Sequence, residues 1–187
     1  MTDDIKKKID VVFIAGGKFH DIDFARLEIL KLLAEDDRMK VRVFEDYSNL
    51  HAIEKADFLI TYTCDVRPTL EQQRVLKNYV SSGNRWLALH GTNSILQFMS
   101  DGKVDSPRIA PVMMETLGSQ FIAHPPIEPY NVKVSQPDHP LVKGVEEFET
   151  TDELYLMELH GDLDVLLEAD YDGKAEGFVE EDWPQET

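Results

Sequence analysis

Short apolar runs mark out four strands in the first half of the chain. Residues 9–15 (IDVVFIA) and 56–62 (ADFLITY) are apolar and rich in β-branched side chains, which is typical of strands buried on both faces. Residues 40–45 (KVRVFE) alternate, which indicates a strand with one face more solvated, and residues 85–90 (RWLALH) form the fourth run.

Helices are predicted between these strands. One runs to about residue 35, with Leu27, Leu30 and Ala34 along one apolar stripe and Leu33 beside them. Another begins at Thr69, because Gln72 stands at the spacing of a capping box. Strands that alternate with helices through short connections predict an α/β domain with a parallel sheet covered on both faces.

The second half of the chain has a different pattern. After a predicted helix at 109–117, five prolines between His124 and Leu141 disfavour further helices. Residues 130–134, 154–157 and 165–169 are candidate strands, expected as antiparallel additions at one edge of the sheet. We find no internal repeat and no interdomain linker, so the sequence predicts a single domain over its 187 residues.

Composition narrows the class of ligand. The chain has 19 basic and 36 acidic residues and a formal charge of -17, which would repel nucleic acids and anionic lipids. No stretch approaches the roughly 20 apolar residues that cross a bilayer, and the first residues do not resemble a signal peptide. Together with a single cysteine, this favours a cytoplasmic protein with a small neutral ligand such as a sugar, or with a metal cation.

Three joints carry the polar residues best placed for chemistry: residues 16–21 (GGKFHD), 63–65 (TCD) and 90–93 (HGTN). Each directly follows a predicted parallel strand, and ligands of open parallel sheets bind at the carboxyl ends of the strands. The pair Gly16-Gly17 is neither a dinucleotide fingerprint nor a phosphate-binding P-loop. It lacks the third glycine of the first motif and the Gly-Lys-Ser/Thr of the second.

His90 is the most informative of these residues. It ends a buried strand and precedes Gly91 and a predicted helix, which is the geometry of a nucleophile elbow with an imidazole in place of serine or cysteine. An imidazole there can act as a base, a hydrogen-bond donor or a metal ligand. The alternative is a structural histidine packed against the strand end.

Cys64 is the rival nucleophile. A reactive thiol needs a lowered pKa, whereas Asp65 beside it would raise the pKa, so we expect a buried or site-adjacent thiol. No histidine pair has the spacing of a helix-borne zinc site, and no metal is predicted. If a divalent ion binds, we expect two imidazoles among His20, His90 and His124, plus one carboxylate, as its ligands.

The ordered set of motifs resembles the ThuA-like (trehalose utilisation) family, a branch of the class I glutamine amidotransferase-like fold. The motifs are GGKFHD (16–21), YTCD (62–65), ALHGTNS (88–94), LGSQFIAHPP (117–126), DHPLVKGVEEF (138–148) and TDELYLME (151–158). The resemblance implies a flavodoxin-like three-layer sandwich with a mostly parallel central sheet. It also implies that His90 replaces the amidotransferase cysteine, which argues against glutamine hydrolysis.

The resemblance further implies an enzyme-like role in the use of trehalose or related, oxidised sugars, with no cofactor indicated. By analogy the catalytic candidates are His90, His20 and Glu153, and the substrate-binding candidates are Gly17, Asn93, His124, Asp152 and Tyr155. Two alternatives stay open: a non-catalytic carbohydrate-binding module, and a hydrolase that uses Cys64. Relatives continue with a further strand where this chain ends in EEDWPQET, and an uncovered sheet edge would favour a homo-oligomer.

Overall fold

The computed structural model describes residues 7–180, which form two compact units. Unit 1 contains residues 7–95 and 108–117, and unit 2 contains residues 96–107 and 118–180. The single domain expected from the sequence stays a prediction, and the expectation about the end of the chain falls on residues 181–187, outside the described part.

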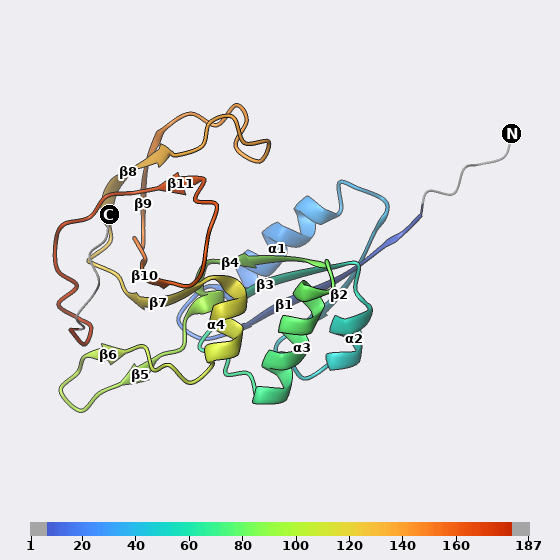
Figure 1. The fold of residues 1–187 in the computed structure, drawn as a ribbon, viewed down its shortest axis with the longest axis horizontal. Helices are drawn as coiled ribbons and strands as arrows, with labels where there is room; N and C mark the ends of the chain where they lie inside the picture. The colour runs from blue at the N-terminus through green and yellow to red at the C-terminus, as the bar shows by residue number, and fades with distance from the viewer. Residues whose placement is uncertain (1–6, 181–187) are drawn as a thin grey trace, which may run out of the picture. The chain divides into compact units, whose positions relative to one another are not determined.

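A four-stranded parallel sheet forms the centre of unit 1 (Figure 1). Its strands stand in the order β2-β1-β3-β4, as expected of a flavodoxin-like fold. They are β1 (Ile9–Gly17), β2 (Met39–Phe44), β3 (Phe58–Cys64) and β4 (Arg85–Leu89). The four predicted strands are therefore confirmed. Both faces of β1 are buried, since Val11, Val12, Phe13 and Ile14 have no exposed surface.

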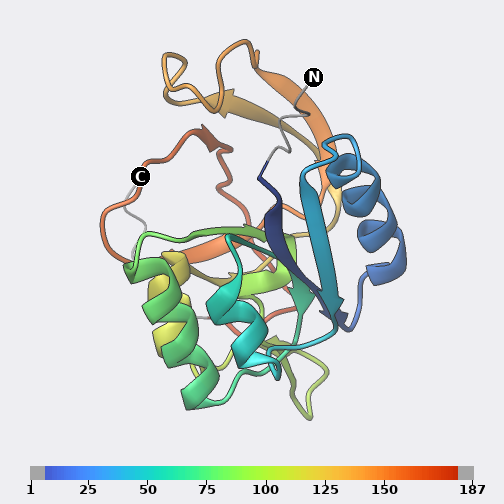
Figure 2. The ribbon, with the colours of Figure 1, turned by 90° about the vertical axis from the view of Figure 1, so that its right-hand side faces the viewer.

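Helices cover both faces of this sheet (Figure 2). They are α1 (Ile22–Leu33), α2 (Leu50–Lys55), α3 (Leu70–Ser81) and α4 (Pro111–Leu117). Val11 and Phe13 pack in one core with α1, whereas Val12 and Ile14 pack in a second core with the other three helices. Successive side chains of a strand point to opposite faces, so one apolar run supplies both cores and the three-layer sandwich follows.

The helix caps follow the sequence closely. Thr69 caps α3 with a complete capping box to Gln72, as predicted, and Leu76 and Tyr79 of this helix are buried. The predicted stripe of α1 is wrong in part, because Leu27 is 51% exposed and Ala34 is exposed too, whereas Leu33, expected beside the stripe, is buried. The short helix α2 was not predicted, since a single turn carries too little periodicity to detect.

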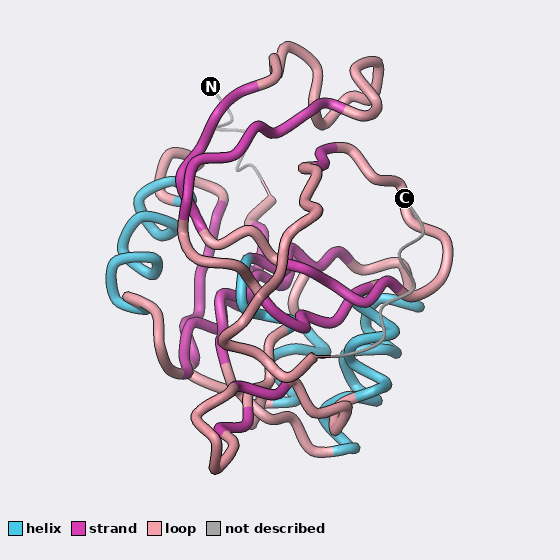
Figure 3. Tube along the Cα trace, turned by 90° about the vertical axis from the view of Figure 1, so that its left-hand side faces the viewer, coloured by secondary structure: helices cyan, strands magenta, loops and turns pink. Residues whose placement is uncertain are grey.

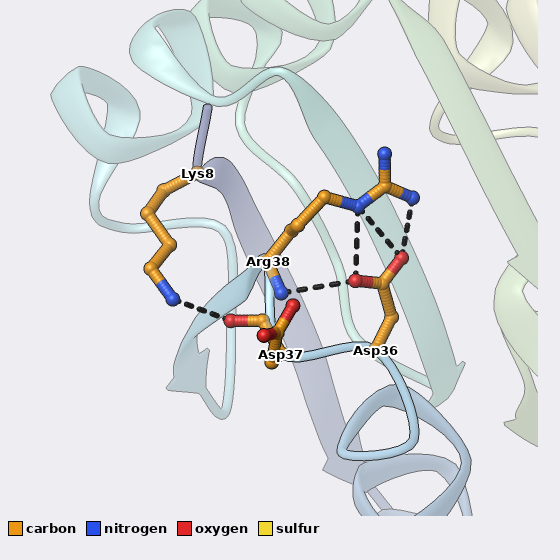
Figure 4. Close-up of polar contacts among 4 residues, drawn as sticks. All are labelled: Lys8, Asp36, Asp37 and Arg38. Atoms are coloured by element: carbon orange, nitrogen blue, oxygen red, sulfur yellow. Dashed lines mark hydrogen bonds and ion pairs between the residues drawn. The ribbon is translucent and has the colours of Figure 1, made fainter. Parts of the chain in front are cut away.

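A polar turn joins α1 to β2 at the N-terminal ends of the strands. The three polar loops 16–21, 63–65 and 90–93 lie at the opposite, C-terminal ends. Arg38 binds the Asp36 carboxylate through both its backbone N–H and its guanidinium, and Lys8 donates to the backbone carbonyl of Asp37 (Figure 4). These contacts connect the start of β2 to the start of β1. We assign them a structural role.

Unit 2 consists of short strands and long loops (Figure 3). Its strands are β5 (Gln97–Phe98), β6 (Val104–Asp105), β7 (Ser119–Ala123), β8 (Glu128–Val134), β9 (Phe148–Asp152), β10 (Leu156–Leu159) and β11 (Leu167–Glu168). These strands pair with one another in antiparallel fashion, as predicted, while Val104 of β6 also forms an isolated parallel bridge with Phe178. The expected place at an edge of the central sheet is wrong, because they pair with one another in the orders β10-β7, β11-β8-β9 and β5-β6.

Within residues 7–180, no helix has both the length and the apolar character required to cross a membrane.

Candidate functional site

The backbone at His90 forms a tight, strained turn. His90 has a φ of 45°, which L-residues other than glycine seldom adopt, and it begins a 3-10 turn, η1 (His90–Asn93). The α-helix expected after the elbow is absent from this stretch. Instead the turn is pinned by Thr92, whose hydroxyl lies 2.8 Å from the carbonyl of Leu89 and 3.0 Å from the hydroxyl of Thr61. Backbone strain held in place by neighbouring contacts is typical of functional positions.

The glycine after His90 permits a close approach to β3. A Cβ atom on Gly91 would lie 2.8 Å from the carbonyl oxygen of Thr63 and 3.0 Å from the Cβ of Cys64. Gly17 meets a similar constraint at the end of β1: its φ is 111°, and a Cβ would lie 1.9 Å from the carbonyl oxygen of Cys64. We therefore attribute a structural requirement to Gly17, and its predicted role in substrate binding stays a prediction.

The loop after β1 presents His20 to this turn. The ring centroids of His20 and His90 are 4.4 Å apart with the planes at 83°, and both side chains are partly buried. The ring of Tyr62 lies 5.8 Å from His90 in a stacked arrangement and 6.4 Å from His20. We call these three side chains the imidazole cluster.

One hydrogen bond orients His20. Its Nδ1 lies 3.3 Å from the backbone carbonyl oxygen of Lys18, and a carbonyl can only accept, so Nδ1 carries the proton. The lone pair of the ring is consequently on Nε2. The same relation, a ring N–H donated to a backbone carbonyl, orients histidines that bind metals in proteins.

Asp65 connects the two histidine-bearing loops. Its carboxylate, 5% exposed, lies 3.1 Å from Nζ of Lys18 and 3.1 Å from Nε of Arg67. Its backbone N–H donates to the carbonyl of Ser94 at 2.9 Å, just beyond the His90 turn. The residue itself has a φ of 54°, a conformation that aspartate tolerates better than most side chains. Asp65 therefore braces the loop of His20 against the loop of His90.

Cys64 is buried, with 2% of its surface exposed. Its backbone carbonyl accepts from the N–H of Lys18 at 3.0 Å, so the residue supports the loop of His20 through its main chain. Burial weighs against a thiol that meets substrate.

A polar hollow of about 360 Å³ lies beside His20. Its lining residues are Gly16, Gly17, His20, Asp21, Ile22, Asp23, Arg26 and Glu45. The guanidinium of Arg26 is held there by the Asp23 carboxylate at 2.6 Å and by the carbonyl of Ala15 at 2.8 Å. Carboxylates and a paired guanidinium offer acceptors and donors to hydroxyl groups.

Unit 2 contains four of the predicted residues, His124, Asp152, Glu153 and Tyr155, and brings two of them, His124 and Glu153, together. Nε2 of His124 lies 3.8 Å from a carboxylate oxygen of Glu153, and Nδ1 of His124 lies 2.7 Å from the carbonyl of Pro125. Tyr155 packs against Phe121 with ring centroids 4.5 Å apart. The ring centroids of His124 and Phe178 are 4.9 Å apart. This arrangement makes a histidine–carboxylate pair beside an aromatic group.

Two further candidates are neighbours of these histidines and carboxylates along the chain: Asp152 precedes Glu153, and Asn93 lies three residues after His90. Asp152 is exposed at the end of β9, and its carboxylate accepts from the backbone N–H of Glu153 at 2.8 Å. Asn93 is 7% exposed at the end of η1. The assignment of the catalytic and substrate-binding roles to these residues stays a prediction.

Sequence reasoning missed two members of the arrangement around the imidazole cluster. Tyr62 belongs to a strand run, where an aromatic residue is ordinary core material. Asp65 was considered only for its effect on Cys64. The signal that could have found it is an aspartate directly after a parallel strand, because the next loops at that sheet edge then lie within its reach.

Two solved structures and one protein family are similar to this chain. A ThuA-like protein from Bacteroides uniformis ATCC 8492 has a similar solved structure, with a TM-score of 0.71 and 18% identity, over 88% of this chain and 69% of that one. A ThuA-like protein from Parabacteroides merdae ATCC 43184 gives a TM-score of 0.62 and 18% identity, over 91% of this chain and 71% of that one. No curated protein matches.

Those two likenesses show the fold alone. The family described as "ThuA: Trehalose utilisation" matches residues 10–185, almost the whole sequence, and the chain belongs to this family.

Proposed function

We propose that this chain is a sugar-processing domain that acts on a neutral, oxidised sugar through His20 and His90. The observation that carries the proposal is the 4.4 Å separation of their rings at the carboxyl ends of β1 and β4. Two imidazoles on separate loops, one of them on a strained backbone, favour a reactive centre over incidental packing.

The choice of a sugar rests on the family description and on the surroundings of the pair. The hollow beside His20 offers Asp21 and Glu45 as acceptors for hydroxyl groups. The strongly negative chain, with a formal charge of -17, disfavours phosphorylated sugars and sugar acids. An oxidised sugar supplies what imidazole chemistry needs, because a carbonyl group acidifies the neighbouring C–H bond.

The experiment is proton exchange in D2O. The protein is incubated with trehalose, glucose and their keto derivatives, and NMR follows deuterium incorporation beside the carbonyl. We expect exchange on a keto sugar only, with a loss of at least about 100-fold in His20→Ala and in His90→Ala, within the range general acid–base groups contribute. His51→Ala is the matched control, an exposed histidine on α2. Exchange that survives both site variants would contradict the proposal.

A carbohydrate-binding module without chemistry is the second candidate. Phe19 favours it, because this ring is 58% exposed directly before His20 and could stack on a sugar face. Sugar binding by calorimetry that is lost in Phe19→Ala and kept in His90→Ala, with no proton exchange in the native protein, would replace the first proposal with this one.

A further inference from the structure

The imidazole cluster has the geometry of a partial metal site. A ring nitrogen of His20 and a ring nitrogen of His90 lie within 4.8 Å of each other. Bonds from zinc to imidazole nitrogen are about 2.0–2.1 Å long, so two nitrogens bound at a tetrahedral angle lie about 3.4 Å apart. Binding of one ion by both rings therefore requires the two nitrogens to approach each other by at most about 1.4 Å, which side-chain rotation can supply.

The hydrogen bond of His20 supports the same conclusion independently. Nδ1 donates to the carbonyl of Lys18 at 3.3 Å, which fixes the ring and assigns the lone pair to Nε2. Metal-bound histidines are oriented by this kind of bond, which also raises the basicity of the ligating nitrogen. The loop is held in turn by Asp65, whose carboxylate binds Lys18 at 3.1 Å.

We propose that His20 and His90 bind one divalent transition-metal ion of the zinc type. Imidazole nitrogen suits zinc, nickel and copper, whereas calcium and magnesium prefer oxygen ligands. Two imidazoles leave other positions of the ion open, and ions that act in catalysis keep such positions for water or substrate.

The role of the ion in the reaction rests on the proposed function, whereas its binding does not. An oxidised sugar that presents a carbonyl and a neighbouring hydroxyl could occupy two open positions of the ion with its two oxygens. A bound ion polarises a carbonyl as a Lewis acid and so acidifies the adjacent C–H bond. With the ion bound, the two imidazoles would act through it, water or another side chain would accept the proton, and the loss expected in His20→Ala and His90→Ala would come from loss of the ion rather than of a general base.

The test uses the full chain, freed of metal with a chelator and dialysed. Calorimetry measures binding of Zn²⁺ and Ni²⁺, and the visible spectrum of added Co²⁺ reports the kind of ligand. We expect one ion per chain, with affinity reduced at least about tenfold in His20→Ala and in His90→Ala, as losses around metal sites commonly are. His51→Ala should bind like the native protein. Excess Mg²⁺ and Ca²⁺ should not compete, because they do not favour imidazole.

Two outcomes would overturn the inference. One is the absence of stoichiometric binding; the other is binding unchanged in the double variant His20→Ala/His90→Ala, which would place the ion on the acidic surface. If His90→Ala does not fold, His90→Asn is used instead, since asparagine tolerates the positive φ of this position. Proton exchange on a keto sugar that persists with excess chelator would remove the ion from the reaction and leave the proposed function standing.

Discussion

The two units bury their apolar residues very differently. The strands of unit 1 are parallel with helices on both faces of the sheet, and although the edge strand β4 is largely exposed, β1 contributes five consecutive hydrophobic residues with no exposed surface. The strands of unit 2 are antiparallel, and several of their large side chains are exposed, such as Phe148 at 44% and Leu159 at 58%. Unit 1 therefore has an apolar core on each face of its sheet, whereas the sheets of unit 2 have less buried core of their own.

This difference predicts where side-chain truncation costs most. Phe13→Ala removes a fully buried ring in unit 1 and should lower the free energy of unfolding by about 3–5 kcal/mol. Phe148→Ala is the matched truncation in unit 2 and should cost less than about 1 kcal/mol. Urea denaturation of both variants measures the two values. Equal losses would contradict the contrast between the units.

A second prediction concerns glycine-to-alanine substitutions. They measure how much stability is lost where the backbone leaves no room for a Cβ atom. A Cβ atom on Gly16 would lie 2.0 Å from the carbonyl oxygen of Glu45, so Gly16→Ala must move β1 away from the end of β2. We expect a loss of about 3 kcal/mol. Gly144→Ala in unit 2 meets open space and carries only the strain of a φ of 84°, about 1 kcal/mol. A thermal melt that ranks the two variants in reverse would show that β1 adapts.

The same contrast explains what could be predicted from the sequence. Strands buried on both faces are apolar throughout, and helices with caps such as Thr69 carry clear boundaries, so the fold of unit 1 followed from the pattern. In unit 2, β9 (Phe148–Asp152) contains one large apolar residue in the sequence FETTD, and nothing in that pattern indicates a strand. Its pairing with β8 is a tertiary property that local sequence does not encode.

For the candidate site, the pairing of the two histidines was predictable from the sequence, whereas the contacts of Asp65 were not. His20 and His90 follow parallel strands, so their meeting at one edge of the sheet followed from topology. The brace of Asp65 could not be derived in this way. It depends on a positive φ and on the directions of Lys18 and Arg67, which are fixed only when the loops are folded.

A third prediction tests that brace. Asp65→Asn keeps the size and the positive φ of the residue but removes the charge that holds Lys18 and Arg67. We expect a loss of about 2 kcal/mol in the free energy of unfolding, because the carboxylate is 5% exposed and hydrogen-bonded to cations. Affinity for Zn²⁺ or a keto sugar should fall with it.

The control for Asp65 is another aspartate paired with an arginine. Asp23→Asn removes a pair with Arg26 in which the aspartate is 88% exposed, and exposed pairs contribute less than about 1 kcal/mol. If Asp65→Asn were as mild as this control, with Zn²⁺ affinity unchanged, Asp65 would not position the histidines.

The smallest expected effect concerns alkaline pH and the core of unit 1. Burial raises the pKa of Tyr79 to about 12, and the nearby Asp57 adds to the shift. Burial also raises the pKa of Tyr47, in the same core. Below pH 10 both the folded and the unfolded chain keep these protons, so the phenols add no pH dependence. Above pH 10 the unfolded chain loses them first, and stability falls as the pH rises toward about 12.

Tyr79→Phe separates this effect from the titration of lysines. The variant loses the one O–H donor that lies 3.2 Å from the carbonyl of Ala56 and 3.4 Å from that of Arg85, which should lower stability at pH 8 by about 1 kcal/mol. Its stability should then fall less steeply than that of the native protein between pH 10 and 11, by at most about 1.4 kcal/mol, the limit for one group over one pH unit. Urea denaturation at pH 8, 10 and 11 gives both slopes. Parallel slopes would mean that Tyr79 ionises equally in the folded chain, and hence that the core of unit 1 opens to water at the start of β4.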